Sequence, residues 1–307
     1  MMGGVGIDVS KAYLDVARSK NAETGRVRNN RAGWAALAKG LSSDDRIVLE
    51  ATGGYEQGVL DYLTQAGLWV CRVNARQARD FAKGMGLLAK TDRLDARMLA
   101  QMAVVVTLKR YVPAAPEHQQ ISQWIKRREQ VVETIQRLRQ RLAALEDVLL
   151  RRWAQRELTA AQQQLKRIDA GLRERLLRVP VRTALTSVKG TGLILATTLI
   201  GLVPELGRLS RRAIAKLIGV APLNNDSGLR QGRRSVWGGR APVRSVLYMA
   251  TLTAVRHEPV LRNMYQRLRA NGKAKKVAIV ACMRKFLVIL NARAREYYEK
   301  NPLASVA

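Results

Sequence analysis

Four acidic residues in this chain occupy positions where a carboxylate needs a partner. Asp8 lies inside a short apolar run near the N-terminus, and Glu50 ends a second such run. Burying an unpaired carboxylate costs on the order of several kcal/mol, so both positions imply a partner. Asp92 and Asp95 are three residues apart at the start of an apolar-periodic helix, so both can face one small object. Together the four acids have the composition of a site for one or two divalent metal ions.

The ligand types favour Mg²⁺ or Mn²⁺, because carboxylate oxygens suit these cations. Two such ions about 4 Å apart can clamp the attacking and leaving oxygens of a phosphodiester. The two histidines, His118 and His257, are far apart in sequence, which disfavours a histidine metal site or a Ser-His-Asp hydrolase. The alternative is structural: Thr91 is a good N-cap, and Asp92 and Asp95 would then be stabilised by the helix dipole.

A second reactive group lies in a long polar loop after Pro222. Ser227 is followed by glycine there, and a loop serine is by default a turn former. The loop also carries four arginines: Arg230, Arg233, Arg234 and Arg240. Arginines can clamp a phosphate beside the hydroxyl. We therefore predict that Ser227 attacks a phosphodiester and forms a phosphoserine link, from which strands can be rejoined without another energy source.

The charge of the chain indicates a polyanionic partner. Its 307 residues include 54 lysines and arginines against 24 acids, a formal net charge of +30, so nucleic acid is the leading partner. A membrane surface is the weaker alternative, because the most apolar stretch, 193–203, is too short to span a bilayer. The first apolar run holds Asp8, so no signal peptide is expected, and Cys71 and Cys282 are interpreted as reduced thiols. We expect a cytoplasmic protein with no membrane partner.

Residues 3–110 alternate between strand-like and helix-like patterns, which predicts an α/β layer that positions the acids. The expected strands are 5–9, 13–17, 46–50 and 68–73, and the expected helices are 33–41, 55–65, 76–83 and one that begins near Asp92.

Residues 117–178 predict two amphipathic helices with coiled-coil seams. The seam residues keep a three-four spacing: Ile135, Leu138, Leu142, Leu145 and Leu149, then Leu158, Ala161, Leu165, Ile168 and Leu172. The opposite faces are rich in arginine, which suits either a solvated surface or an arm that tracks a nucleic-acid backbone or dimerises.

After Pro180 the pattern predicts a mostly helical domain with a helix-hairpin-helix-like segment at 188–193. Glycines in such a segment let backbone N–H groups approach a phosphate. Further helices are expected at 209–217, 243–256 and 277–298. Across the domain, the residues expected to bind nucleic acid are Lys189, Gly190, Gly192, Arg230, Arg233, Arg234, Arg240 and Arg244.

Several motifs, in this order, resemble the DEDD transposases of the IS one-ten (IS110) insertion-sequence family, the bridge-RNA-guided recombinases. The motifs are Gly6-Ile7-Asp8-Val9-Ser10-Lys11, Glu50-Ala51-Thr52-Gly53, Lys90-Thr91-Asp92 with Asp95, Gly219-Val220-Ala221-Pro222, Asp226-Ser227-Gly228 and Trp237-Gly238-Gly239-Arg240. The resemblance covers nearly the whole chain.

The resemblance implies a RuvC-like, RNase H-fold domain at 1–112, a coiled-coil connector at 113–179 and a transposase domain at 180–307 that carries the serine. It implies Asp8, Glu50, Asp92 and Asp95 as the catalytic metal-binding tetrad and Ser227 as the nucleophile. Family members find donor and target DNA through a structured non-coding RNA. They work as homodimers that pair into a tetramer, where the tetrad of one protomer faces the serine of another.

Three other readings of the residues remain open. The nearest is a RuvC-like nuclease or junction resolvase that hydrolyses DNA with metal-bound water, in which Ser227 is structural. A second is a non-catalytic nucleic-acid-binding protein whose acids are helix caps. A tyrosine recombinase is less favoured, since its histidine-containing arginine constellation is hard to assemble from His118 and His257.

Overall fold

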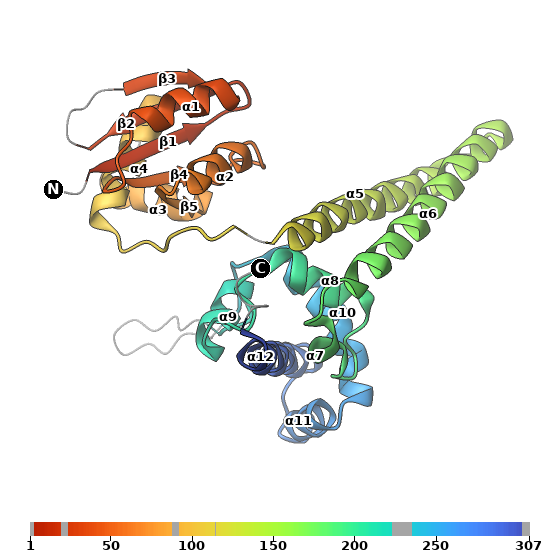
Figure 1. The fold of residues 1–307 in the computed structure, drawn as a ribbon. Helices are drawn as coiled ribbons and strands as arrows, with labels where there is room; N and C mark the ends of the chain where they lie inside the picture. Colours follow the sequence, from red (N-terminus) through yellow and green to blue (C-terminus); the bar gives the residue numbers. More distant parts are fainter. Residues whose placement is uncertain (1–2, 20–23, 88–91, 114, 223–234, 303–307) are drawn as a thin grey trace. The chain divides into compact units, whose positions relative to one another are not determined.

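A computed structural model describes residues 3–19, 24–87, 92–113, 115–222 and 235–302, and the side chains of Asp92 and Arg93 fall outside that description (Figure 1). The chain forms two compact units, residues 1–113 and 114–307. The first is a mixed α/β unit and the second is mostly helical. The division into three domains expected from the sequence stays a prediction.

The first unit is built on a mixed five-stranded sheet. Its strands are β1 Gly4–Val9, β2 Tyr13–Arg18, β3 Thr24–Arg28, β4 Arg46–Glu50 and β5 Trp69–Val73, in the spatial order β3-β2-β1-β4-β5. The pairs β1–β2 and β2–β3 are antiparallel, whereas β1–β4 and β4–β5 are parallel. The sheet therefore changes from antiparallel to parallel pairing at β1.

Helices cover both faces of this sheet (Figure 1). They are α1 Arg31–Lys39, α2 Gln57–Gln65, α3 Ala75–Gly84 and α4 Asp92–Val105. One face, which includes Val5, Ile7 and Leu49, packs against α1 and α2. The other face, which includes Val48 and Cys71, packs against α3 and α4. The period-two alternation of strand side chains separates the two cores.

Glycines in β1 let α4 lie directly on the sheet. A Cβ at Gly4 would lie 2.3 Å from the carbonyl oxygen of Ala100, and one at Gly6 would lie 2.0 Å from that of Ala96. Real Cβ atoms do not approach so closely, so both positions require glycine. The close packing fixes α4 relative to β1, and β1 carries Asp8.

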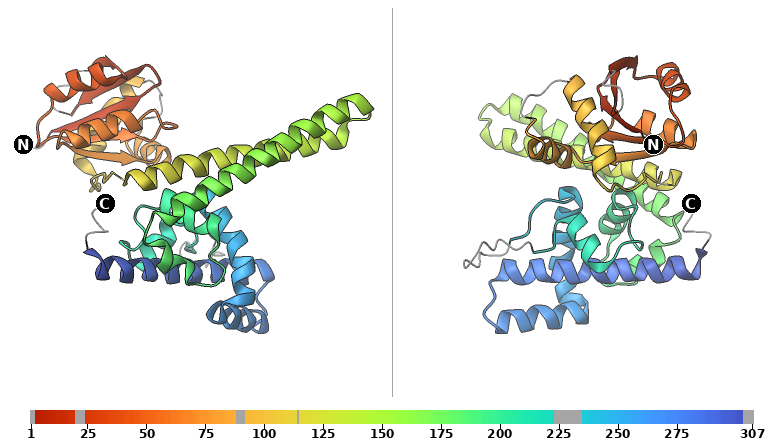
Figure 2. Two further views of the ribbon diagram at one scale, coloured as in Figure 1. Left: turned by 45° about the vertical axis from the view of Figure 1, so that its right-hand side comes forward. Right: turned by 90° about the vertical axis from the view of Figure 1, so that its left-hand side faces the viewer.

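The second unit contains the remaining helices. They are α5 Pro116–Ala144, α6 Val148–Leu177, α7 Arg182–Thr186, α8 Leu193–Leu202, α9 Arg211–Ile218, α10 Ala241–His257, α11 Pro259–Ala270 and α12 Lys275–Lys300. Figures 1 and 2 show α5 and α6 as a long antiparallel pair. Residues of this pair, including Ile121 and Leu172, share one core with Leu199 of α8 and Phe286 of α12.

The residues of the predicted seam are buried or half-buried along α5 and α6 but not at the tip, and the coiled coil itself stays a prediction. Ile135, Leu138 and Leu158 are buried, but Leu149 is 53% exposed. The reason is local: α5 ends at Ala144, and the Asp147 side chain caps α6 by accepting a hydrogen bond from the backbone N–H of Leu150 at 2.9 Å. The apolar three-four spacing in the sequence runs on from α5 through the turn to Leu149, and the spacing alone does not show where the helix ends.

The structure adds one strand to the sequence-based prediction and confirms one of its helices. The strand β3 was missed, because it is a mostly exposed edge strand of sequence TGRVR, without an apolar alternation. The helix α9 was expected and is observed, with Ser210 as N-cap and Gly219 in the left-handed conformation at its C-terminal end. No helix in the described ranges is long and apolar enough to cross a membrane.

Candidate acidic site and serine-loop base

Asp8 and Glu50 lie side by side on neighbouring parallel strands. Ile7 of β1 is paired in register with Leu49 of β4, and Asp8 and Glu50 are the next residue on each strand. Side chains in register on paired strands point to the same face, here the face covered by α4. Both acids are half-buried. Regular strand pairing therefore brings together two acids that are 42 positions apart.

The N-terminal end of α4 approaches the same place. The close contacts run from Gly4 against Ala100 to Gly6 against Ala96, so two steps along β1 correspond to four steps back along α4. Two strand residues span about 6.6 Å and four helical residues about 6 Å, so this correspondence persists. Continued by one more step, the same correspondence leads from Asp8 to the start of α4, where Asp92 stands in the sequence. Asp95 is half-buried and directly precedes the contact residue Ala96.

The side chains that the structure describes are not grouped as the ligands of a metal ion. Among them, no group of three or more aspartate, glutamate, histidine or cysteine residues is arranged to hold a metal ion. The side chain of Asp92, one of the four predicted ligands, is outside that set. Backbone placement thus supports a convergence of the acids, and their role as metal ligands stays a prediction.

Glu56 shapes the turn that follows Glu50, and the sequence analysis overlooked it. Its buried carboxylate accepts hydrogen bonds from the backbone N–H groups of Thr52 at 3.1 Å and Gly54 at 2.9 Å. Its other oxygen is 3.6 Å from the guanidinium of Arg72. The signal was available, because an acid shortly after a Thr-Gly-Gly turn can satisfy the N–H groups of that turn.

The predicted nucleophile and three predicted phosphate-binding arginines lie outside the described residues. These are Ser227, Arg230, Arg233 and Arg234. Thr91, the expected N-cap of α4, also lies outside them.

The two flanks of this serine-bearing segment meet at the C-terminal end of α9. A Cβ at Gly219 would lie 2.1 Å from the carbonyl oxygen of Gly238, and one at Gly239 would lie 2.4 Å from the backbone nitrogen of Gly219. All three glycines have positive φ. The backbone N–H of Arg240 also donates to the carbonyl of Leu217 at 3.1 Å. We call this crossing, with the side chains of Arg240 and Arg244, the loop base.

Arg240 and Arg244 have structural partners in the loop base. Arg240 forms a bidentate ion pair with Glu205, with both nitrogen–oxygen distances at 2.7 Å, and donates to the carbonyl of Leu202 at 2.8 Å. Arg244 donates to the carbonyls of Ile218 and Gly238. Their predicted binding of nucleic acid stays a prediction, and the contacts give both a positioning role as well.

The residues of the predicted helix-hairpin-helix-like segment also have structural contacts, while their predicted binding role is separate from those contacts. Gly190 has a φ of 96°, and a Cβ there would lie 2.5 Å from that of Ala254, so this glycine permits contact with α10. The backbone N–H of Lys189 donates to Glu258 at 3.3 Å, and Gly192 is the N-cap residue of α8. These contacts account for the fold of the segment. Phosphate binding by Lys189, Gly190 and Gly192 stays a prediction.

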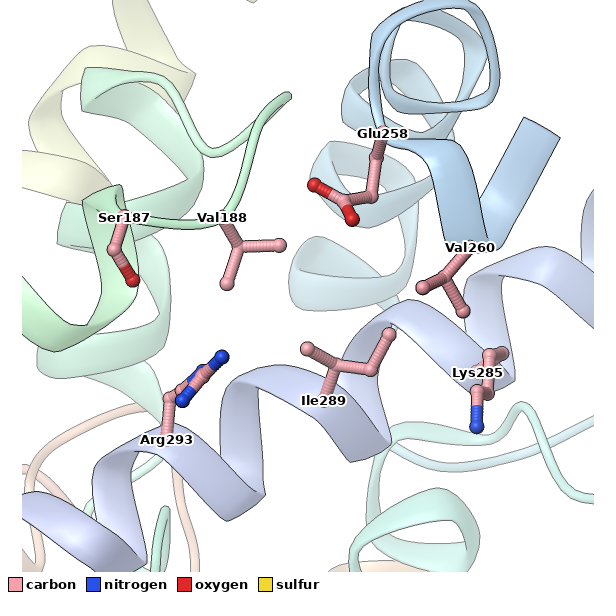
Figure 3. A pocket seen from close by; sticks show the side chains of 7 residues that line it. All are labelled: Ser187, Val188, Glu258, Val260, Lys285, Ile289 and Arg293. Carbon is pink, nitrogen blue, oxygen red and sulfur yellow. The ribbon is translucent and has the colours of Figure 1, made fainter.

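An open pocket lies beside this hairpin (Figure 3). Glu258 and Arg293 point into it from opposite sides, with Val188 and Ile289 between them. Arg293 also pairs with Glu296 at 3.1 Å on the exposed surface. Arg293 and Glu258 are thus engaged by partners outside the pocket lining, Glu296 and the backbone N–H of Lys189.

Neither cysteine is suited to nucleophilic chemistry. Burial raises the pKa of Cys71 to about 11 and that of Cys282 to about 11, so both thiols are protonated at neutral pH. Burial also lowers the pKa of His118 from its usual value, because it disfavours the charged imidazolium.

Comparison with known proteins identifies the class of this protein. Residues 5–149 match the family model DEDD_Tnp_IS110, described as "Transposase", and residues 182–266 match the model "Transposase IS116/IS110/IS902 family". The protein is thus a DNA transposase, a DNA-recombining enzyme. The two matches follow each other along most of the chain, and the chain belongs to the IS110 family of transposases.

Curated relatives agree with this assignment. The chain is 25% identical over 311 residues to the pilin gene-inverting protein of Moraxella lacunata, with 95% of each chain covered. It is 26% identical over 314 residues to the protein of the same name from Moraxella bovis, again with 95% coverage of both. The uncharacterized 43.6 kDa protein of insertion element IS110 from Streptomyces coelicolor is 28% identical over 153 residues, which cover 48% of this chain and 38% of that one.

Proposed function

We propose that this transposase cuts and rejoins donor and target DNA through a covalent phosphoserine formed on Ser227, at a site completed by Asp8, Glu50, Asp92 and Asp95. One observation carries the proposal: Asp8 and Glu50 share one face of the sheet, and α4 packs against that face through Ala96 and Ala100, shortly after Asp92 and Asp95. This packing supports the proposal that the two segments holding the predicted tetrad act together.

The strand arrangement supports a RuvC-like, RNase H-fold assignment for the first unit. An antiparallel β3-β2-β1 hairpin layer continues into the parallel strands β4 and β5, with acids at the ends of β1 and β4. The long pairing of α5 with α6 supports the coiled-coil connector in the same way, and the loop between α7 and α8 supports the helix-hairpin-helix-like segment.

The four acids are chemically suited to Mg²⁺ or Mn²⁺, since they offer only carboxylate oxygens. Such a cation, when bound, would neutralise charge on the scissile phosphate. Asp8 and Glu50 would hold it from the strands, and Asp92 and Asp95 would hold it from α4.

Ser227 supplies the covalent step. Its oxygen attacks the phosphorus, the bond from phosphorus to one deoxyribose oxygen breaks, and the serine proton is lost while the departing oxygen gains one. The phosphoester bond energy is kept in the phosphoserine, so a second DNA hydroxyl can reverse the step and join new strands. Nearby Arg230, Arg233 and Arg234 would stabilise the charged phosphate.

The proposed partners follow from the resemblance and from the charge of the chain. They are donor DNA, target DNA, a non-coding guide RNA and further copies of this chain, assembled as dimers and then a tetramer. The net charge of +30 suits the phosphates of two nucleic acids. The predicted contacts at Lys189, Gly190, Gly192, Arg240 and Arg244 would serve them. We propose a cytoplasmic location, where such DNA is accessible.

The second candidate is a metal-dependent DNA nuclease or junction resolvase that uses water, with Ser227 as a structural residue. The relatives named for gene inversion favour strand rejoining over simple cleavage. A trapping experiment separates the two functions. Denaturation after reaction with labelled DNA should leave a covalent protein–DNA adduct in the wild type and none in Ser227→Ala. Undiminished cleavage by Ser227→Ala would overturn the phosphoserine mechanism.

A further inference from the structure

A row of charged side chains crosses the sheet on the face covered by α4. Arg26 of β3 is the register partner of Asp15 of β2, and Asp15 is the register partner of Asp8 of β1. Glu50 of β4 lies beside Asp8 on the next strand. The order across the sheet is therefore cation, acid, acid, acid, and the first acid belongs to no predicted ligand set.

Asp15 is buried and tightly held. Only 5% of its surface is exposed, and its two carboxylate oxygens accept from Nε and Nη2 of Arg26, each at 2.9 Å. The guanidinium of Arg26 also lies 5.4 Å from the ring centroid of Tyr13. A bidentate pair of this kind fixes the direction of the carboxylate as well as its charge. The carboxylate of Asp15 is thus engaged on the side toward β3.

This arrangement matters for Asp8 because the two acids are direct cross-strand neighbours. Directly opposite residues have Cβ atoms about 4.5–5.5 Å apart, and like charges at that distance repel. Arg26 compensates the charge of Asp15, so the pair adds little net charge to the predicted cation site. Without Arg26, the Asp15 carboxylate would lose both of these hydrogen bonds and would add its negative charge beside Asp8 and Glu50.

We propose that Asp15 and Arg26 form a positioning pair beside the acidic site: Arg26 holds the Asp15 carboxylate toward β3 and balances its charge, and this sets the net charge beside Asp8 and Glu50 on which cation affinity depends. The inference rests on the proposed function, in which these acids bind a divalent cation. It assigns roles to two residues outside the predicted tetrad.

The same strand offers a matched control. Arg18 of β2 pairs with the buried Asp45 at 3.6 Å, and Arg18 is the register partner of Val5, three residues before Asp8. Three strand residues span about 10 Å, roughly one Debye length at 0.1 M salt. Loss of Arg18 therefore also leaves a buried acid in this unit without its ion pair, but away from the cation site.

The test is a titration of the full-length protein with Mn²⁺, in which the paramagnetic resonance signal of the free ion measures how much Mn²⁺ is bound. Arg26→Ala leaves one extra negative charge and should tighten Mn²⁺ binding by about threefold to tenfold. Asp15→Asn leaves one extra positive charge and should weaken binding by a similar factor. The double variant Asp15→Asn/Arg26→Gln restores the balance and should return to within about twofold of wild type, as should Arg18→Ala.

The outcomes separate the two proposals. If the wild type binds Mn²⁺, Asp8→Asn abolishes that binding and the Arg26 and Asp15 variants bind as the wild type does, the positioning pair is overturned and the acidic site stands. If Asp8→Asn leaves binding intact, both are overturned. Asp15→Asn is nearly isosteric and should keep the fold, so its weakened binding tests the pair even if Arg26→Ala unfolds.

Discussion

The proposed acidic site and the loop base differ in how their backbone is held. In the first unit, strand register places Asp8 and Glu50 side by side, and two glycines let α4 pack on the same face of the sheet. The backbone that carries these acids is therefore regular secondary structure. In the second unit, irregular backbone is held by a glycine crossing and by the Arg240–Glu205 pair. A site on rigid elements tolerates changes in its surroundings, whereas an irregular one depends on each contact that fixes its backbone.

The largest effect is expected at the acids themselves. Asp8→Asn and Asp92→Asn should each lower strand exchange by about 100-fold to 1,000-fold, because a neutral amide stabilises a cation poorly beside the scissile phosphate. DNA affinity should stay within about twofold, as measured by filter binding. Asp44→Asn, at an exposed position, is the control and should retain activity. Wild-type rates in Asp8→Asn would refute the acidic site.

The next largest effect is expected at the glycine crossing. Gly219→Ala forces a Cβ to 2.1 Å from the carbonyl of Gly238 and should lower strand exchange by about tenfold to 100-fold, because a shift of about 1 Å in a reacting group costs that much. The control is Gly272→Ala, which shares positive φ, although a Cβ there would meet no described atom within 4 Å. Equal losses in both variants would mean that backbone strain alone explains the effect.

Arg240 tests whether the loop base is a support or a DNA contact. As a support, Arg240→Ala should lower strand exchange about tenfold and leave the salt dependence of DNA binding unchanged. As a phosphate contact, it should reduce the log-log salt slope by about 0.9 on duplex DNA. Arg293→Ala, which also loses an ion pair of this unit, is the control for the loss of a charge.

The smallest effect is expected at the two thiols, one in each unit. Their raised pKa values mean that the thiolate fraction is small until the pH nears 11, so N-ethylmaleimide at pH 7.5 should modify neither cysteine of the folded protein. Mass spectrometry measures this directly. Rapid labelling at Cys71 alone would show that the first unit opens more readily than the second.

Much of the acidic site was predictable from local pattern. Asp8 and Glu50 interrupt apolar runs, and those runs are strands β1 and β4 as expected. Asp15 was overlooked, although it could have been found from the sequence. Its strand was predicted, and a hairpin that turns between Ser10 and Tyr13 pairs residue 8 with residue 15. Arg26 was beyond reach, because the edge strand that carries it has no apolar alternation.

The sequence by itself determined which reactive groups this protein has available: a strongly basic chain, four acids at strand ends and a helix start, and a serine among arginines. These are properties of residue type and short spacing, which local physics fixes. The tertiary structure decided which residues share a face and which arginines are engaged. Register and close backbone crossings depend on contacts between distant segments, such as Gly6 with Ala96 and Arg240 with Glu205, and local spacing does not encode those.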